Sequence, residues 1–257
     1  MRLPIFIMSK DRPLFLKTYL ESLERTYLDI TVFWKAGEIF QPAYAELKAA
    51  YPDVVFQEEK IPLKDALSEW TMAKDEGDNG IGMITVDDNV SCAPWKPEVI
   101  IDAMSYPTLF GFSLRLHPGI AKQNNDSKPN RSGVMFYNPS TMRTHWEYVW
   151  EMSSSFYRMR DIRRVVFASR CETINQVEGK GMELFKGKVT KMACYDYAPL
   201  FNIYVDTHRN VKLEKEHAMT NEEALKLYQD GAELDVERYT RFRDQHGVTH
   251  VMRIFLK

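Results

Sequence analysis

Two adjacent aspartates, Asp87 and Asp88, are followed by the amide Asn89, directly after an apolar run that spans residues 81–86. Turn-forming residues lie on both sides of this run, so the run predicts a buried central strand. In open α/β sheets, ligands bind in the crevice outside the carboxyl ends of the strands. Carboxylate and amide oxygens placed there suit a divalent cation that carries a phosphate. A simple surface turn is the alternative for three such residues taken alone.

The elements before these acids alternate between strand and helix. Apolar runs predict strands over residues 3–8, 30–34, 54–57 and 81–86, and apolar spacings of three and four predict helices that start near residue 13 and span 42–51 and 64–76. Asp11 is expected to cap the first helix, and Pro13 suits its first turn. This order predicts an α/β fold with a parallel sheet.

The composition is that of a folded protein, because 44% of the 257 residues are hydrophobic and 27% are charged. A formal net charge of -2 gives no overall attraction to nucleic acid, so we expect no nucleic-acid partner. No run approaches the roughly 18 apolar residues that span a bilayer, so we expect no transmembrane segment and a cytoplasmic location. Cys92, Cys171 and Cys194 are odd in number and widely spaced, which favours free thiols.

The first part of the chain resembles the A-type (GT-A) nucleotide-sugar glycosyltransferases, especially the family 2 group. These enzymes have a short polar turn after the first strand, which Ser9 to Arg12 resembles, and then a helix with a Leu-x-Ser-Leu core, which residues 20–23 resemble. The Val-Asp-Asp-Asn run at 86–89 falls where the family places its metal-binding Asp-x-Asp motif. The resemblance extends to about residue 115. It implies a GT-A-like, Rossmann-type fold with a mixed, mainly parallel sheet flanked by helices.

By this resemblance the chain binds a nucleotide-sugar donor, with a UDP-sugar as the first expectation. Ser9, Lys10 and Arg12 are expected to hold the base end of the donor. Asp87 is expected to bond the ribose or to help a metal. Arg209, far along the chain, is expected to meet the diphosphate through paired hydrogen bonds.

The resemblance also implies a metal cofactor, Mn²⁺ or Mg²⁺, held by Asp88 together with Asn89. In the common form of the motif the last of three acids binds the metal, and here that position is Asn89. A neutral amide is a weaker ligand for a hard cation than a carboxylate. Some enzymes of this type complete the metal site with a later histidine, so His208 is a third candidate ligand, with a solvent-facing loop position as its alternative.

The resemblance favours an inverting transfer, which needs a general base to accept the proton of the acceptor hydroxyl. Glu178, in a helix expected within residues 171–185, is the first candidate, and Glu151 and Glu172 follow it. The Glu-Asp pair usual in the family is absent, and a solvated helix face is the alternative for each glutamate. The acceptor side is expected in residues 145–160, where aromatic rings and polar groups alternate and suit sugars.

The later part of the chain is expected to finish one domain and to add an appendage. Residues 117–131 are polar and rich in turn formers, which predicts a loop, either a lid over the substrate or a surface excursion. Residues 1–211 are expected to form the catalytic domain. Residues 212–257 are expected to form a helix–strand appendage with a capping box at Thr220. This appendage would pack on the catalytic domain, complete its acceptor end or support a homodimer.

The sequence therefore predicts a glycosyltransferase of the hexosyltransferase class, which moves a sugar from a nucleotide diphosphate to a glycan, a glycolipid or another hydroxyl acceptor. A sugar-phosphate nucleotidyltransferase shares the nucleotide-on-sheet architecture, but residues 9–13 lack the glycine-rich loop expected after its first strand. A non-catalytic carbohydrate-binding or scaffold protein that kept the fold and lost the metal is the other alternative.

Overall fold

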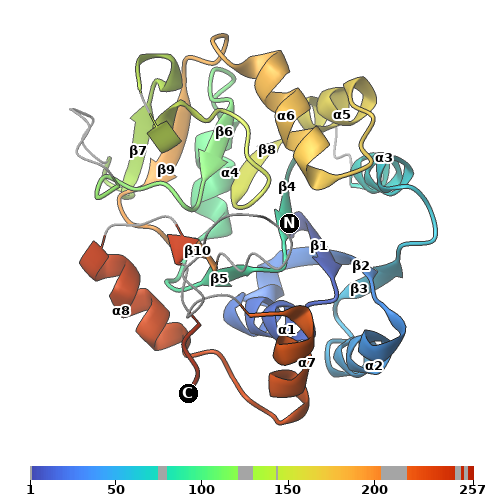
Figure 1. Cartoon of the computed structure of the whole chain (residues 1–257). Coiled ribbons are helices and arrows are strands. Elements are labelled where there is room, and N and C mark those ends of the chain that lie inside the picture. The colour runs from blue at the N-terminus through green and yellow to red at the C-terminus, as the bar shows by residue number, and fades with distance from the viewer. Residues whose placement is uncertain are drawn as a thin grey trace.

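The computed structural model describes residues 2–74, 80–120, 130–142, 144–203, 219–246, 250–251 and 254–257 (Figure 1). Its strands are β1 Leu3–Lys10, β2 Leu28–Lys35, β3 Val55–Glu58, β4 Ile81–Val86, β5 Asn89–Ser91, β6 Gly111–Ser113, β7 Val134–Tyr137, β8 Ser155–Arg158, β9 Met192–Tyr195, β10 Leu200–Ile203 and β11 His250–Val251. Its α-helices are α1 Pro13–Ser22, α2 Gln41–Ala50, α3 Leu63–Ala73, α4 Pro97–Ser105, α5 Met159–Ala168, α6 Ile174–Phe185, α7 Asn221–Gln229 and α8 Val236–His246. None of the helices in these ranges has both the length and the hydrophobicity needed to cross a bilayer.

The main sheet has eight strands in the order β3-β2-β1-β4-β8-β6-β9-β7. The neighbours β3, β2, β1 and β4 are parallel, and so are β6 and β9. Strand β8 is antiparallel to β4 and β6, and β7 is antiparallel to β9. The mixed, mainly parallel sheet expected from the sequence is therefore confirmed. The chain places β2 and β3 on one side of β1 and β4 on the other, so the strand order reverses between β1 and β4.

Side chains alternate between the two faces of this sheet, and each face has its own core. Ile5 and Ile7 belong to the cluster that includes side chains of α1, α2 and α4, whereas Phe6 belongs to the cluster with α3, α5 and α6. Met83 and Ile84 of β4 divide in the same way. Figure 1 shows α3, α5 and α6 grouped on one side of the sheet and α1 and α2 on the other. Burial on both faces explains why β1 and β4 are nearly continuous apolar runs.

A second sheet, in the order β11-β10-β5, joins the last part of the chain to the acidic motif. Strand β5 begins at Asn89 and pairs antiparallel with β10, so that Asn89 lies opposite Asn202. A third cluster of buried side chains packs α1, this small sheet and the C-terminal helices together: Leu14, Phe15, Val90, Phe201, Ile203, Ala224, Leu234, Tyr239 and Phe255. The predicted capping box at Thr220 is present, with Glu223 as its partner. The described residues after 219 therefore pack against α1 and β10.

The turn after β1 differs from expectation. Asp11 does not cap α1, because its backbone is left-handed, with φ 56°, and its carboxylate Oδ1 accepts a hydrogen bond from the N–H of Gly37 at 2.7 Å. Its own N–H donates to the carbonyl of Lys35 at 3.2 Å. Helix α1 starts after Arg12 instead, with Pro13 in its first turn. Asp11 therefore fastens the end of β1 to the end of β2.

Candidate functional site

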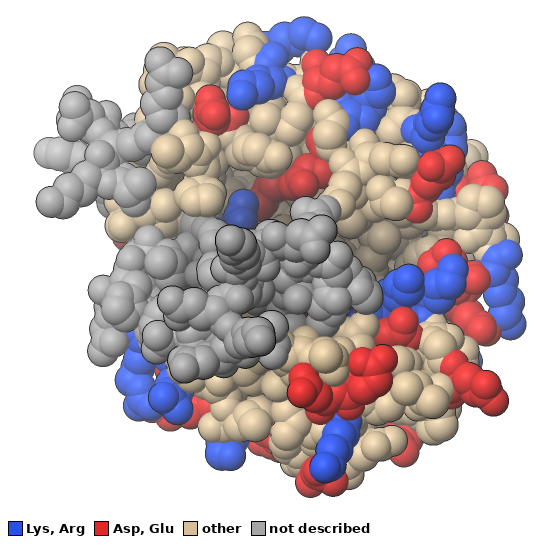
Figure 2. Space-filling model, viewed as in Figure 1, with Lys and Arg blue, Asp and Glu red and all other residues tan. Residues whose placement is uncertain are grey.

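The candidate site lies where β1 and β4 end, at the reversal of strand order. The two strands are parallel neighbours, and the N–H of Asp87 donates to the carbonyl of Met8 at 3.1 Å. The turn from Ser9 to Arg12 and the acids after β4 are therefore brought side by side, as expected for a ligand site of an α/β sheet. Figure 2 shows a hollow near the centre of this face of the molecule, with acidic and basic side chains exposed in it.

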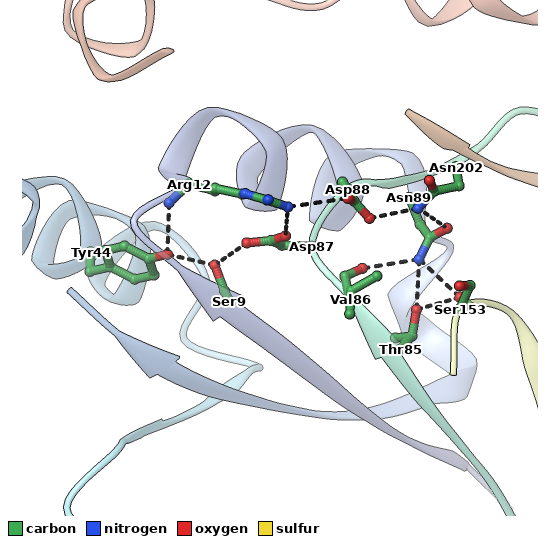
Figure 3. A network of polar contacts seen from close by, with 10 residues as sticks. All are labelled: Ser9, Arg12, Tyr44, Thr85, Val86, Asp87, Asp88, Asn89, Ser153 and Asn202. Atoms are coloured by element: carbon green, nitrogen blue, oxygen red, sulfur yellow. Dashed lines mark hydrogen bonds and ion pairs between the residues drawn. The ribbon is translucent and has the colours of Figure 1, made fainter. Parts of the chain in front are cut away.

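A compact network joins Ser9 and Arg12 to both aspartates (Figure 3). Ser9 Oγ donates to Asp87 Oδ2 at 2.7 Å. Arg12 Nη1 donates to Asp88 Oδ2 at 3.1 Å and lies 3.5 Å from Asp87 Oδ1. The Nδ2 amide of Asn202 donates to Asp88 Oδ1 at 2.6 Å. Every oxygen of the two carboxylates thus faces a hydrogen-bond donor of the protein.

An aromatic pair supports the β1 side of this network. The Tyr44 hydroxyl lies 2.5 Å from Ser9 Oγ and accepts a hydrogen bond from the N–H of Arg12 at 3.2 Å. The Tyr44 ring stacks on Trp34, with 4.8 Å between ring centroids and 11° between planes. Trp34 is half-buried at the end of β2 and lies opposite Ser9 in the β1–β2 register. A flat aromatic surface therefore borders the polar network.

Asn89 lies inside the protein, with 1% of its surface exposed. Its Nδ2 amide faces three acceptors: Thr85 Oγ1 at 2.8 Å, the carbonyl of Ser153 at 2.9 Å and the carbonyl of Val86 at 3.0 Å. Thr85 Oγ1 also donates to the carbonyl of Ser153, at 2.6 Å. Asn89 therefore ties the end of β4 to the segment that leads into β8.

Burial and the neighbouring charges shift the pKa values of the ionisable groups in the network. Burial raises the pKa of Asp87, and of the two nearby charges Arg12 opposes the rise and Asp88 adds to it. Burial also raises the pKa of Asp88, with Arg12 again opposing. The pKa of Arg12 is lowered by burial and raised more strongly by the two aspartates, so its net shift is upward. A guanidinium that stays charged is therefore shared by two carboxylates that resist ionisation.

A divalent cation at this site would need free oxygen atoms on Asp87, Asp88 and Asn89. Asp87 and Asp88 are suitable hard ligands, but their oxygens already accept from Arg12, Ser9 and Asn202. Asn89 Oδ1 faces the Asn202 amide at 3.5 Å. Within the described ranges there is no cluster of three or more His, Cys, Asp or Glu side chains able to hold a metal ion. The described residues therefore do not fit a divalent cation as they are arranged.

A second polar cluster surrounds Glu151, near the start of β8. Ser154 Oγ and Ser155 Oγ donate to Glu151 Oε1 at 2.8 and 2.6 Å. Arg115 Nη2 lies 2.6 Å from Glu151 Oε2. This contact is an ion pair by distance, although neither Oε2 nor Arg115 Nε has a well-aligned hydrogen bond. Because Ser153 contacts Asn89, the segment that carries Glu151 also borders the first cluster.

The remaining predicted site residues have different surroundings. Lys10 is exposed at the end of β1. Glu178 is half-buried on α6, and Glu172 is exposed before that helix. His208 and Arg209 lie outside the described residues, so their roles stay predictions. The structure therefore brings together Ser9, Arg12, Asp87, Asp88 and Asn89, and it places Glu151 in a neighbouring cluster.

Sequence reasoning missed three residues that hold the network. Tyr44 and Trp34 come from α2 and β2, and no local pattern marks them. Asn202 did leave a signal, because it is a single amide within an otherwise apolar strand, β10. A polar side chain that interrupts a buried strand usually has a hydrogen-bonding partner, and here the partner is Asp88.

No family model matches the chain, and no curated protein matches it significantly. A crystal structure of TarS from S. aureus matches with a TM-score of 0.50 and 8% identity, over 80% of this chain and 37% of that one. A structure of TarS 1–349 in complex with UDP-GlcNAc matches with a TM-score of 0.46 and 10% identity, over 76% of this chain and 58% of that one.

A further match is 4-diphosphocytidyl-2C-methyl-D-erythritolsynthase from Anaerococcus prevotii, with a TM-score of 0.44 and 11% identity, over 93% of this chain and 96% of that one. Likenesses with TM-scores under 0.5 carry no weight for the fold. The TarS likeness at 0.50 shows the fold alone, and this chain spans 37% of that protein's chain. Together with the strand order, it shows that this chain has the GT-A-like α/β fold expected from its sequence.

Proposed function

We propose that this chain is a glycosyltransferase that moves a sugar from a nucleotide diphosphate donor to a hydroxyl of a glycan, a glycolipid or another acceptor. The observation that supports it most is the meeting of Asp87 and Asp88 with the turn from Ser9 to Arg12. These two segments meet at the edge of the sheet where α/β folds bind nucleotides. The same two segments carry the sequence resemblance to GT-A enzymes, which favours a UDP-sugar. A fold likeness at 8% identity does not by itself choose a donor.

In this proposal the nucleoside lies beside β1 and β2, and the diphosphate lies beside Arg12. Trp34 offers a half-buried ring that Tyr44 supports from one side, and aromatic rings stack well on bases. Asp87 bonds the ribose, since an acidic side chain near this edge commonly accepts from ribose hydroxyls. The exposed ammonium of Lys10 adds positive charge at the same edge. Each group thus has a matching part of the donor.

The transfer itself joins the acceptor oxygen to the anomeric carbon while the bond from that carbon to the diphosphate breaks. The proton of the acceptor hydroxyl passes to a carboxylate. We assign this base to Glu178, which is half-buried. The pKa of Tyr148 is raised first by burial and then by the charge of Glu178, so the Glu178 carboxylate lies near that ring. Glu151 is assigned a positioning role, because its carboxylate is already held by Arg115 and two serines.

The expected cofactor, Mn²⁺ or Mg²⁺, stays a prediction of the sequence. The roles given to His208 in a metal site and to Arg209 at the diphosphate likewise stay predictions, because both lie outside the described residues.

A thermal-shift panel with UDP, GDP, CDP and their sugars tests the donor class. A ligand at about 100 times its Kd stabilises a protein by roughly 2.7 kcal/mol. For a chain of this size the melting temperature should then rise by about 5–10 °C. We expect one nucleotide diphosphate and its sugar to give this rise. Glu178→Gln should keep the rise and lose sugar transfer, with Glu183→Gln on the same helix as the matched control.

The other outcomes select the alternatives. Stabilisation by a nucleoside triphosphate together with a sugar phosphate, and no response to nucleotide sugars, would assign nucleotidyl transfer. A response to none of these nucleotides would leave a carbohydrate-binding or scaffold role for the fold. Loss of nucleotide binding in Glu178→Gln would show that Glu178 contacts the donor and not the acceptor.

A further inference from the structure

We infer that Arg12 takes the place of a divalent cation in this site, so that the nucleotide diphosphate binds to the guanidinium without added metal. This inference rests on the proposed function and deepens it. The sequence predicts that Arg12 holds the base end of the donor, whereas the structure places its guanidinium on the two acids of the Asp-x-Asp-like motif. The side chain that bears the cation is 20% exposed, so it lies at the surface of the site.

The first support is the position of the charge. A single nitrogen, Arg12 Nη1, lies 3.1 Å from Asp88 Oδ2 and 3.5 Å from Asp87 Oδ1 (Figure 3). In a motif of this kind a metal ion would supply positive charge to the acids, and here Arg12 Nη1 supplies that charge. The other two oxygens accept from Ser9 and Asn202 at 2.7 and 2.6 Å. A metal ion would have to displace donors that are already in place.

The second support is that the backbone fixes Arg12 before any ligand binds. Asp11 adopts a left-handed conformation and bonds to the N–H of Gly37 and the carbonyl of Lys35. The N–H of Arg12 donates to the Tyr44 hydroxyl at 3.2 Å. Helix α1 begins at Pro13, so the positive end of its dipole also lies beside Arg12. This preorganised guanidinium suits the planar oxygen pairs of a diphosphate.

The third support is that Arg12 and a metal ion exclude each other. Arg12 occupies carboxylate oxygens of Asp87 and Asp88 that would hold the metal ion, and two cations on one pair of carboxylates would repel each other. Removal of the guanidinium would leave two adjacent acids with no cation between them. We therefore expect the Arg12→Ala variant to bind Mn²⁺ more tightly than the natural protein does.

Calorimetric titrations test this exchange of cations. Mn²⁺ alone and UDP alone are each titrated into the full chain and into Arg12→Ala, and UDP is also titrated with EDTA and with Mn²⁺. We expect the natural protein to bind UDP equally well under both conditions and to show no Mn²⁺ binding. Arg12→Ala should lose UDP affinity about tenfold or more in EDTA, because a charge-assisted contact is lost. It should bind Mn²⁺ and recover UDP affinity when Mn²⁺ is present.

Two controls isolate the position of Arg12. Arg25→Ala removes an arginine that pairs with Asp53 at 3.0 Å away from the network, and it should change neither titration. Arg12→Lys keeps a cation without the guanidinium fork and should retain part of the UDP affinity in EDTA. It serves as the test variant if Arg12→Ala does not fold.

The possible failures separate the inference from the function. UDP binding by the natural protein that requires Mn²⁺ would overturn the inference and keep the proposed donor class. Absence of UDP binding under both conditions would remove both. Arg12→Ala that binds UDP in EDTA as the natural protein does, or that gains no Mn²⁺ binding, would overturn the role given to Arg12.

Discussion

Two clusters in this molecule pair arginine with carboxylates, and they differ in how their charges balance. In the cluster around Asp87 and Asp88, one guanidinium serves two acids. In the cluster around Glu151, one guanidinium serves one acid, and two serine hydroxyls complete the set. The first cluster lies at the reversal of strand order, whereas the second holds the segment before β8.

The difference in charge balance separates a site where a ligand can replace contacts within the protein from one where it cannot. The charge of Glu151 is balanced by that of Arg115, so a ligand has little to gain there. At Asp87 and Asp88 the charges are unbalanced, and burial raises the pKa of both acids. An unbalanced polar cluster at a binding edge is typical of a functional site. We therefore assign donor binding to the first cluster and a positioning role to the second.

The largest effect is expected from Glu151→Gln. The substitution leaves Arg115, whose side chain is 14% exposed, without its counter-charge, although the serines keep an acceptor. Breaking a buried ion pair by removal of one partner costs about 3 kcal/mol or more of the free energy of unfolding. Chemical denaturation measures this loss, and UDP binding should stay as in the natural protein. A stable variant that loses transfer would instead make Glu151 the base and cancel the contrast between the clusters.

Asp88→Asn should weaken donor binding about 100-fold, because it removes the closer of the two carboxylates that hold Arg12. That loss corresponds to about 2.7 kcal/mol of binding free energy. Titration with UDP measures it, and Asp53→Asn, in the Arg25 pair, is the matched control. Unchanged UDP affinity in Asp88→Asn would remove the acidic motif from the donor site.

Asn89→Asp introduces the third acid that the metal-binding form of the motif carries. It tests whether residue 89 faces a ligand, as the sequence predicts, or the protein interior, as the structure shows. In the structure, position 89 faces the carbonyl oxygens of Val86 and Ser153. A carboxylate there loses both hydrogen bonds and meets oxygen atoms, so the free energy of unfolding should fall by about 2 kcal/mol. An increase in stability, or tight Mn²⁺ binding in this variant, would show that residue 89 faces the ligand.

The smallest of these effects is expected in α6, which packs beside the second cluster. A Cβ atom at Gly181 would clash with the buried ring of Trp150, whereas a Cβ atom at Gly179 would have no other atom within 4 Å. Gly181→Ala should lower the free energy of unfolding by about 1–2 kcal/mol through overpacking. Gly179→Ala should raise it by roughly 0.5–1 kcal/mol, because alanine favours helix. Equal effects at the two positions would contradict the packing of α6 on Trp150.

The sequence predicts the strands that carry the site because β1 and β4 are buried on both faces. Their apolar runs are therefore continuous, and the polar residues that follow mark their carboxyl ends. Ser9, Arg12, Asp87 and Asp88 meet because these strands are parallel neighbours. A sequence pattern can predict that these residues come together, since this prediction needs only the order of the elements and their periodicity.

The partners of these residues depend on contacts that no local pattern encodes. Asn89 lies inside because β5 pairs with β10, whose Asn202 is more than a hundred residues away in the chain. The Tyr44 hydroxyl reaches Ser9 only once α2 has packed on the sheet. Asp11 bonds to Gly37 instead of capping α1, because the ends of β1 and β2 lie together. The sequence therefore identified the acids but not what holds them.

A crystal structure of the protein with a bound UDP-sugar would show whether the donor diphosphate binds to Arg12. We predict that diphosphate oxygens lie about 3 Å from the Arg12 guanidinium, with the base beside Trp34. A nucleotide bound elsewhere on the molecule, with Arg12, Asp87 and Asp88 in contact with no part of it, would contradict the account.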